Sequence, residues 1–108
     1  MAQATLLQGT LDLLILRTLA LGPLHGVAIA DRIAQVTRGT FSVKAGSLFP
    51  ALHRLEAEGW VVGEWGETSS GRRVTLYTLT RSGRKQLEAQ KRSWIRVQQA
   101  IQQVLEMS

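Results

Sequence analysis

An apolar stripe near the end of the chain restricts the fold more strongly than any other pattern in the sequence. Between residues 81 and 107, apolar side chains recur at heptad spacing, which predicts one continuous helix about 40 Å long. The stripe consists of Leu87, Trp94, Ile101, Val97 and Val104. A chain of 108 residues buries only about two thirds of the surface of its unfolded state, so this helix extends beyond the core. We therefore expect a homodimer in which two such helices pack through Leu87, Trp94, Val97, Ile101, Val104 and Leu105.

Three shorter helical patterns precede this long helix. Apolar spacing predicts helices over about residues 10–20, 26–37 and 45–58. Pro50 has to lie in the first turn of the third helix, where its missing N–H costs no hydrogen bond. The third helix is expected to bury Leu48, Leu52 and Leu55. Residues 40–43, between the second and third helices, predict one brief strand.

A β-hairpin is expected between the third helix and the long helix. Residues 60–65 and 74–79 are rich in β-branched and aromatic side chains, and a polar, glycine-containing segment joins them. Trp60 and Trp65 are expected to pack in the core or at the sheet edge, and Thr80 is expected to cap the long helix. The predicted fold is mainly α with a small β-hairpin. It comprises a winged helix-turn-helix domain over residues 1–80 and a C-terminal dimerisation helix over residues 81–108.

Composition excludes several classes of function. The chain has no cysteine, which excludes a disulfide scaffold, thiolate zinc sites and thiol catalysis. It also lacks a nucleophile elbow, a Walker-type glycine loop and a carboxylate pair in an apolar setting, so we expect no enzyme. Two histidines and few carboxylates predict no metal site and no cofactor. No apolar run approaches the roughly 20 residues of a membrane span, and residues 1–8 contain no lysine or arginine. We expect a cytoplasmic protein.

The net charge of +5 favours an anionic partner such as double-stranded DNA. In a winged helix-turn-helix, the third helix enters the major groove and the hairpin reaches phosphates or the minor groove. The residues expected at the DNA are Lys44, Ser47, Phe49, Pro50, His53, Arg54, Arg72 and Arg73. The alternative interpretation is an ordinary solvated helix face and two solvated charges in a turn.

Residues 44–60, which read KAGSLFPALHRLEAEGW, resemble the recognition-helix signature of the PadR family of bacterial winged-helix transcriptional regulators. Residues 7–12, 22–26, 71–73 and 77–83 resemble the opening, first interhelical turn, wing and strand-to-helix junction of that family. The family usually has tyrosine where this chain has Phe49, whose ring can pack or touch a thymine methyl but cannot donate a hydrogen bond. The resemblance implies a homodimeric, sequence-specific regulator, expected to be a repressor, that reads a palindromic operator.

Residues 93–97 resemble the segment with which drug-sensing family members line a pocket at the dimer interface. The resemblance implies a small aromatic effector bound at Trp94 and Val97. The plain alternative is that Trp94 only packs in the dimer core. A different class of function also stays open: a winged-helix dimer that binds a protein partner or a small molecule without reading DNA sequence.

Overall fold

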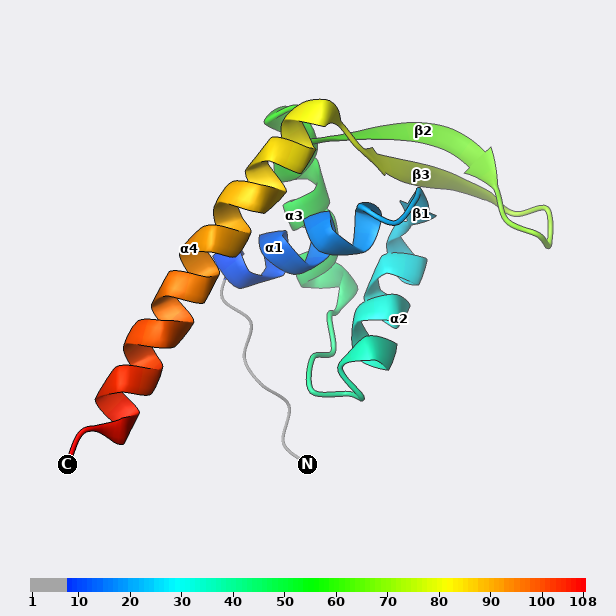
Figure 1. Ribbon diagram of the computed structural model, residues 1–108. Helices are drawn as coiled ribbons and strands as arrows, with labels where there is room; N and C mark the ends of the chain where they lie inside the picture. The colour runs from blue at the N-terminus through cyan, green and yellow to red at the C-terminus, as the bar shows by residue number, and fades with distance from the viewer. Residues whose placement is uncertain (1–7) are drawn as a thin grey trace.

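The computed structural model describes residues 8–108, so residues 1–7 of the predicted domain, including Leu7 of its opening motif, lie outside the described residues. The predicted fold class, a winged helix-turn-helix with a small sheet and a long final helix, is confirmed. The elements follow one another along the chain (Figure 1) as α1 (Gln8–Leu19), β1 (Leu24–His25), α2 (Gly26–Val36), α3 (Ala45–Ala57), β2 (Val61–Glu67), β3 (Arg73–Leu79) and α4 (Arg81–Glu106).

The sheet has three antiparallel strands in the order β1-β3-β2. Strands β2 and β3 form the predicted hairpin, and β1 pairs with β3 through Leu24 opposite Tyr77. The prediction of a strand at residues 40–43 is wrong. The backbone N–H of Phe41 there donates to the hydroxyl of Thr37 at 3.1 Å, so this segment closes the end of α2 instead of pairing with the sheet. A two-residue strand such as β1 is too short to give an alternating pattern in the sequence.

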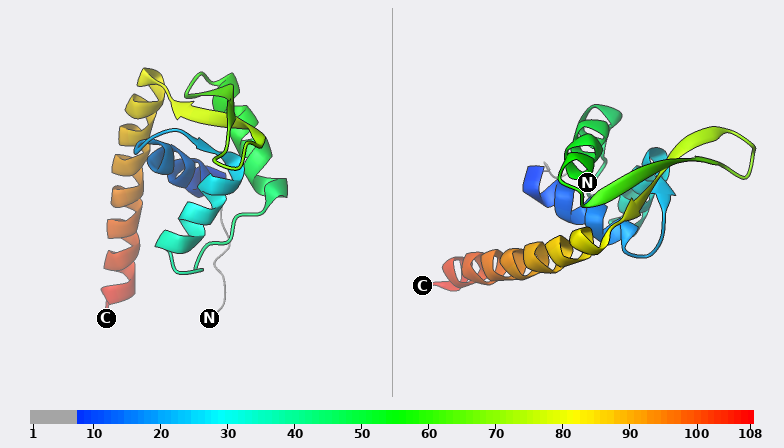
Figure 2. Two further views of the ribbon diagram at one scale, coloured as in Figure 1. Left: turned by 90° about the vertical axis from the view of Figure 1, so that its right-hand side faces the viewer. Right: turned by 90° about the horizontal axis from the view of Figure 1, so that it is seen from above.

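Helix α1 is the centre of the core. Figure 2 shows it between α3 on one side and α4 on the other, and it contacts both helices. Ile15 and Leu16 of α1 are fully buried, and the predicted stripe of α3 is buried against them. The members of that stripe are Leu48, Leu52 and Leu55. The prediction that Pro50 lies in the first turn of α3 is wrong, because α3 begins at Ala45 and Pro50 is its sixth residue. The N–H of Leu48 already donates to the carbonyl of Lys44, so the N–H that Pro50 lacks is the one that would donate to the carbonyl of Gly46.

The two tryptophans of the hairpin differ in their surroundings: Trp60 directly precedes β2, and Trp65 lies within it. Trp60 packs against the core, as expected. Trp65 does not, because the hairpin has left the core by this point and 74% of the Trp65 surface is exposed. Its ring instead lies under the guanidinium of Arg73, 4.8 Å from Cζ to the ring centroid. This is a cation–π contact across the hairpin.

Helix α4 starts in the core and then leaves it. The hydroxyl of Thr80 accepts from the N–H of Gly83 at 3.0 Å and donates to the carbonyl of Gly59 at 2.7 Å. A β-carbon on Gly83 would lie 2.0 Å from the carbonyl oxygen of Trp60, so only glycine fits there. Leu87, one turn later, is only 4% exposed and belongs to the core of the single chain. The expectation that Leu87 lies in a dimer interface is therefore wrong, because its surface is already buried.

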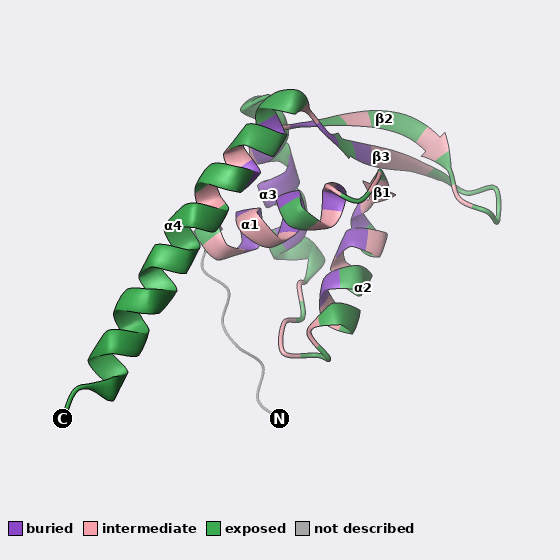
Figure 3. Ribbon diagram, viewed as in Figure 1, coloured by how far each residue is buried: buried purple, intermediate pink, exposed green. Residues whose placement is uncertain are grey.

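From residue 91 onward every residue of α4 is exposed. Figure 3 shows this exposed stretch pointing away from the body of the molecule, whereas the buried residues gather where α1, α2, α3 and the sheet meet. The chain is correspondingly elongated, with extents of 58 × 33 × 22 Å.

Candidate nucleic-acid interface

One face of α3 points to solvent and carries most of the side chains expected at DNA. Ser47, Pro50 and His53 are exposed and recur at helical spacing. The opposite face of the same helix is buried through Leu48, Ala51, Leu52 and Leu55. Packing of this apolar face against α1 therefore fixes which side chains α3 presents.

The N-terminus of α3 is open and positively charged. Lys44 is the N-cap residue, is exposed, and makes no capping hydrogen bond with its side chain. Its carbonyl accepts from the N–H groups of Ser47 and Leu48, both at 2.9 Å. The N–H groups in the first turn of α3, the helix dipole and the Lys44 ammonium group together favour binding of an anion such as a phosphate.

Phe49 joins α3 to the start of α2. A β-carbon on Gly26 would come within 2.7 Å of Phe49 Cε1, so the aromatic ring fills the space that the glycine leaves free. The residue as a whole is still 36% exposed. Phe49 thus positions α3 relative to α2 and still contributes apolar surface beside Ser47 and Pro50. This packing role needs no tyrosine hydroxyl.

Arg54 is engaged within the chain. Its Nη2 donates to Oδ1 of Asp12, which lies on α1 and is only 7% exposed. Burial raises the pKa of the Asp12 carboxyl, and the neighbouring Arg54 guanidinium lowers it in part. The pair ties α3 to α1. Sequence reasoning missed it, although a lone aspartate in the apolar helix α1 is a signal for a buried partner.

The hairpin carries two exposed arginines whose surroundings differ. Thr68 closes the turn, because its backbone N–H donates to the carbonyl of Arg72 and its hydroxyl accepts from the N–H of Arg72. The side chain of Arg72 is exposed beyond this turn. Arg73 stacks on Trp65 and lies opposite Glu67 in the register of the hairpin. Arg73 is therefore partly balanced by Glu67. The tip of the hairpin extends away from α3 (Figure 1).

The exposed part of α4 presents an uncovered apolar stripe. Its residues are between 46% and 74% exposed, and they are Trp94, Val97, Ile101, Val104 and Leu105. A hollow of about 400 Å³ lies where α4 passes the start of α1, and Trp94, Val97, Leu13 and Gln90 line it. The side-chain carbonyl oxygen of Gln90 is buried and accepts no hydrogen bond within residues 8–108. The predicted effector residues therefore share one hollow.

The rest of the described chain offers little other chemistry. His25 caps α2, with Nδ1 accepting from the N–H of Ala28 at 3.3 Å. Among residues 8–108, no three histidine, aspartate or glutamate side chains are grouped so that they could hold a metal ion. None of the helices described here is both long and apolar enough to span a bilayer.

Comparison with known proteins identifies the family. Residues 15–89 match the Transcriptional regulator PadR-like family. Transcriptional regulator Rv3488 of Mycobacterium tuberculosis is 35% identical over 79 residues, which cover 73% of this chain and 70% of that protein. A PadR family transcription regulator from Clostridium difficile is 29% identical, with a TM-score of 0.77 over 88% of this chain and 97% of the other. A transcriptional regulator from Clostridium thermocellum is 28% identical, with a TM-score of 0.81 over 89% and 93% of the two chains. The chain therefore belongs to the PadR-like family, and it is a transcriptional regulator with a DNA-binding winged helix.

Proposed function

We propose that this regulator is a homodimeric repressor that reads a palindromic operator. The observation that carries the proposal is the stripe of apolar side chains that α4 leaves uncovered while the same chain exposes one face of α3. Burial of the stripe would stabilise a dimer, and the exposed face of α3 is the surface with which each chain would contact DNA.

The energetics of the exposed part of α4 favour a dimer. An isolated helical extension of four turns is marginal in water, so the exposed part of α4 needs tertiary or quaternary contacts to be stable. Full burial of one large apolar side chain is worth about 1.5–3 kcal/mol. Five such side chains lie along one face of α4 at positions compatible with packing against an identical helix. In the proposed dimer, the same apolar residues of the second α4 cover this stripe.

The exposed face of α3 is the part of each chain proposed to read DNA. In the proposed complex, Ser47, Pro50 and His53 reach base edges or the groove wall, and Lys44 reaches a phosphate. Phe49 contributes the part of its surface that stays exposed, and Arg54 acts as a positioning residue through Asp12. From the hairpin, Arg72 and Arg73 contact the sugar–phosphate backbone of the DNA. Two α3 helices held by the dimer fit half-sites about one helical turn apart, or a multiple of that spacing.

The hollow beside Trp94 is the proposed effector site. A flat aromatic compound can stack on the Trp94 ring, and a donor group on it can satisfy the buried Gln90 carbonyl. Such a compound releases the operator if it binds more tightly to a dimer whose half-site spacing differs from that of the DNA-bound state. Aromatic dyes should quench tryptophan emission in the wild type and lose this effect in Trp94→Ala. The matched control is Trp65→Ala, which removes a different exposed tryptophan.

Sedimentation equilibrium tests the dimer. The wild-type chain should sediment at twice 11.9 kDa, and Val97→Glu should sediment as a monomer whose circular dichroism shows a folded body. Gln99→Glu adds the same charge on the opposite side of α4 and should leave the dimer intact. A Val97→Glu protein that remains dimeric would place the interface elsewhere.

A further inference from the structure

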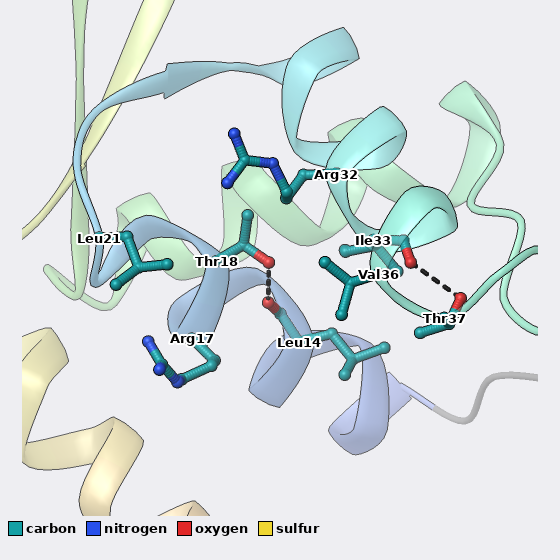
Figure 4. A pocket seen from close by; sticks show the side chains of 8 residues that line it. All are labelled: Leu14, Arg17, Thr18, Leu21, Arg32, Ile33, Val36 and Thr37. Atoms are coloured by element: carbon teal, nitrogen blue, oxygen red, sulfur yellow. Dashed lines mark hydrogen bonds between the residues drawn. The ribbon is translucent and has the colours of Figure 1, made fainter.

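An apolar groove lies between α1 and α2, away from the hollow beside Trp94. Its volume is about 230 Å³, and its walls are the aliphatic side chains of Leu14, Leu21, Ile33 and Val36. Figure 4 shows Leu14 and Val36 facing one another across it. Leu21 and Val36 are more than 70% exposed, so this apolar surface is open to solvent in the single chain.

The hydroxyl groups that line the groove are engaged in hydrogen bonds, whereas its two guanidinium groups form no salt bridge within residues 8–108. The hydroxyl of Thr18 donates to the carbonyl of Leu14 at 2.7 Å, and the hydroxyl of Thr37 donates to that of Ile33 at 2.8 Å. Both hydroxyl protons are therefore used within the helices themselves. The remaining polar groups of the lining are the guanidiniums of Arg17 and Arg32, and no carboxylate lines the groove. Neither arginine forms a salt bridge within residues 8–108.

The two arginines give the groove a charged end and an apolar end. In Figure 4 both guanidiniums lie toward Leu21, whereas Leu14, Ile33 and Val36 form the other end. A smaller hollow of about 130 Å³ continues from the charged end and shares Leu21 and Arg32 with the groove. An elongated ligand with one anionic terminus matches this polarity.

We propose that this groove binds a free aliphatic monocarboxylate. The chain of the acid lies between α1 and α2, and its carboxylate accepts hydrogen bonds from Arg17 and Arg32. The groove is smaller than the roughly 300–1,000 Å³ of sites for drug-sized ligands, which favours a short acid. No aromatic side chain lines it, so nothing there stacks on a flat ring as Trp94 does. The site is thus chemically distinct from the proposed effector site.

Titration of the full chain with octanoate, kept below the concentration at which it forms micelles, tests the proposal. Amide resonances of residues 14–37 should shift along a saturable curve, whereas 1-octanol should bind more weakly because it lacks the charge. Arg32→Gln and Arg17→Gln should each weaken octanoate binding about fivefold, as expected for one partly exposed ion pair. Arg92→Gln removes an exposed arginine of α4 and should leave the affinity unchanged.

Three outcomes would overturn the assignment. The first is a titration that never saturates. The second is saturable binding that survives in both arginine variants but is lost in Trp94→Ala, which would place the acid in the hollow beside α4. The third is a groove covered by another copy of the chain, revealed if Val36→Asp converts a dimer to a monomer and octanoate fails to bind the wild type.

Discussion

Helices α1 and α4 both carry many apolar side chains, but the fold uses them differently. The apolar residues of α1 are enclosed by α2, α3, the sheet and the start of α4. The apolar residues of α4 beyond Gln90 stay exposed, although Trp94 and Val97 border α1 at the hollow beside Leu13. The core of the body is therefore complete within one chain, whereas the proposed function makes stability of the end of α4 depend on a second copy of the chain.

The boundary between these two regions falls within a single helix. Thr80, Gly83 and Leu87 anchor the first two turns of α4 to the hairpin and the core. The turns that follow carry the same heptad pattern into solvent. In the proposed dimer, a helix that is anchored at one end and apolar at the other would set the distance between the two α3 helices.

A matched pair of leucine truncations tests this division with the largest expected effect. Leu55→Ala removes a fully buried side chain and should lower the free energy of unfolding by about 3 kcal/mol at any protein concentration. Leu105→Ala removes a side chain that is 74% exposed and should weaken only the concentration-dependent part of stability. Urea unfolding at two protein concentrations measures both. Equal, concentration-independent losses would contradict the division.

The ion pair between α1 and α3 provides a second test, within the body alone. Arg54→Ala leaves the buried carboxylate of Asp12 without its partner and should cost about 2 kcal/mol of unfolding free energy. Asp12→Asn should cost less, because the remaining guanidinium is partly exposed and can be solvated. Thermal or urea unfolding ranks the two variants. If Asp12→Asn instead lowers the free energy of unfolding more than Arg54→Ala, the cost does not come from leaving a buried carboxylate without a partner.

Binding to DNA should distinguish the hairpin from α3. Arg73→Ala should weaken binding to the preferred site and to random DNA about equally, and should reduce the slope of log K against log salt by about one. His53→Ala should weaken the preferred site more than random DNA and leave the slope nearly unchanged. Fluorescence anisotropy over a range of salt concentrations gives both quantities. Identical behaviour of the two variants would contradict the assignment of separate roles.

The smallest expected effect is a pH dependence from Asp12. Burial raises the pKa of this carboxyl above its ordinary value, so the folded chain holds the proton more tightly than the unfolded chain. The ionised form therefore weakens folding, and this cost disappears as the pH falls through the raised pKa of the folded state. The unfolding free energy of the wild type should rise relative to Asp12→Asn between neutral pH and about pH 4. A relative fall would mean that Arg54 outweighs burial.

Local patterns in the sequence predict most of the fold. The leucine stripe predicts the buried face of α3, and Thr80 marks the start of α4, whereas Pro50 lies inside α3 and not in its first turn. The contacts that these patterns miss depend on residues far apart in the sequence. A heptad repeat does not reveal that Leu87 falls inside the core.

The candidate DNA-binding surface follows the same rule. Helical spacing alone places Ser47, Pro50 and His53 on the exposed face of α3. The partner of Arg54 lies 42 residues away on α1, and the partner of Arg73 lies on the neighbouring strand, so neither contact has a local signal. Residue type and spacing therefore predict which side chains can reach DNA but not which are already engaged within the chain.

Selection of binding sites from a random duplex library, at near-physiological salt and with the full-length protein, tests the central claim most directly. If α4 joins two α3 helices into one reading unit, the selected DNA should contain a two-fold symmetric motif with half-sites about one helical turn apart, or a multiple of that distance. Recovery of no motif, together with binding that disappears as the salt concentration rises, would contradict the account and reduce the basic charge to non-specific attraction.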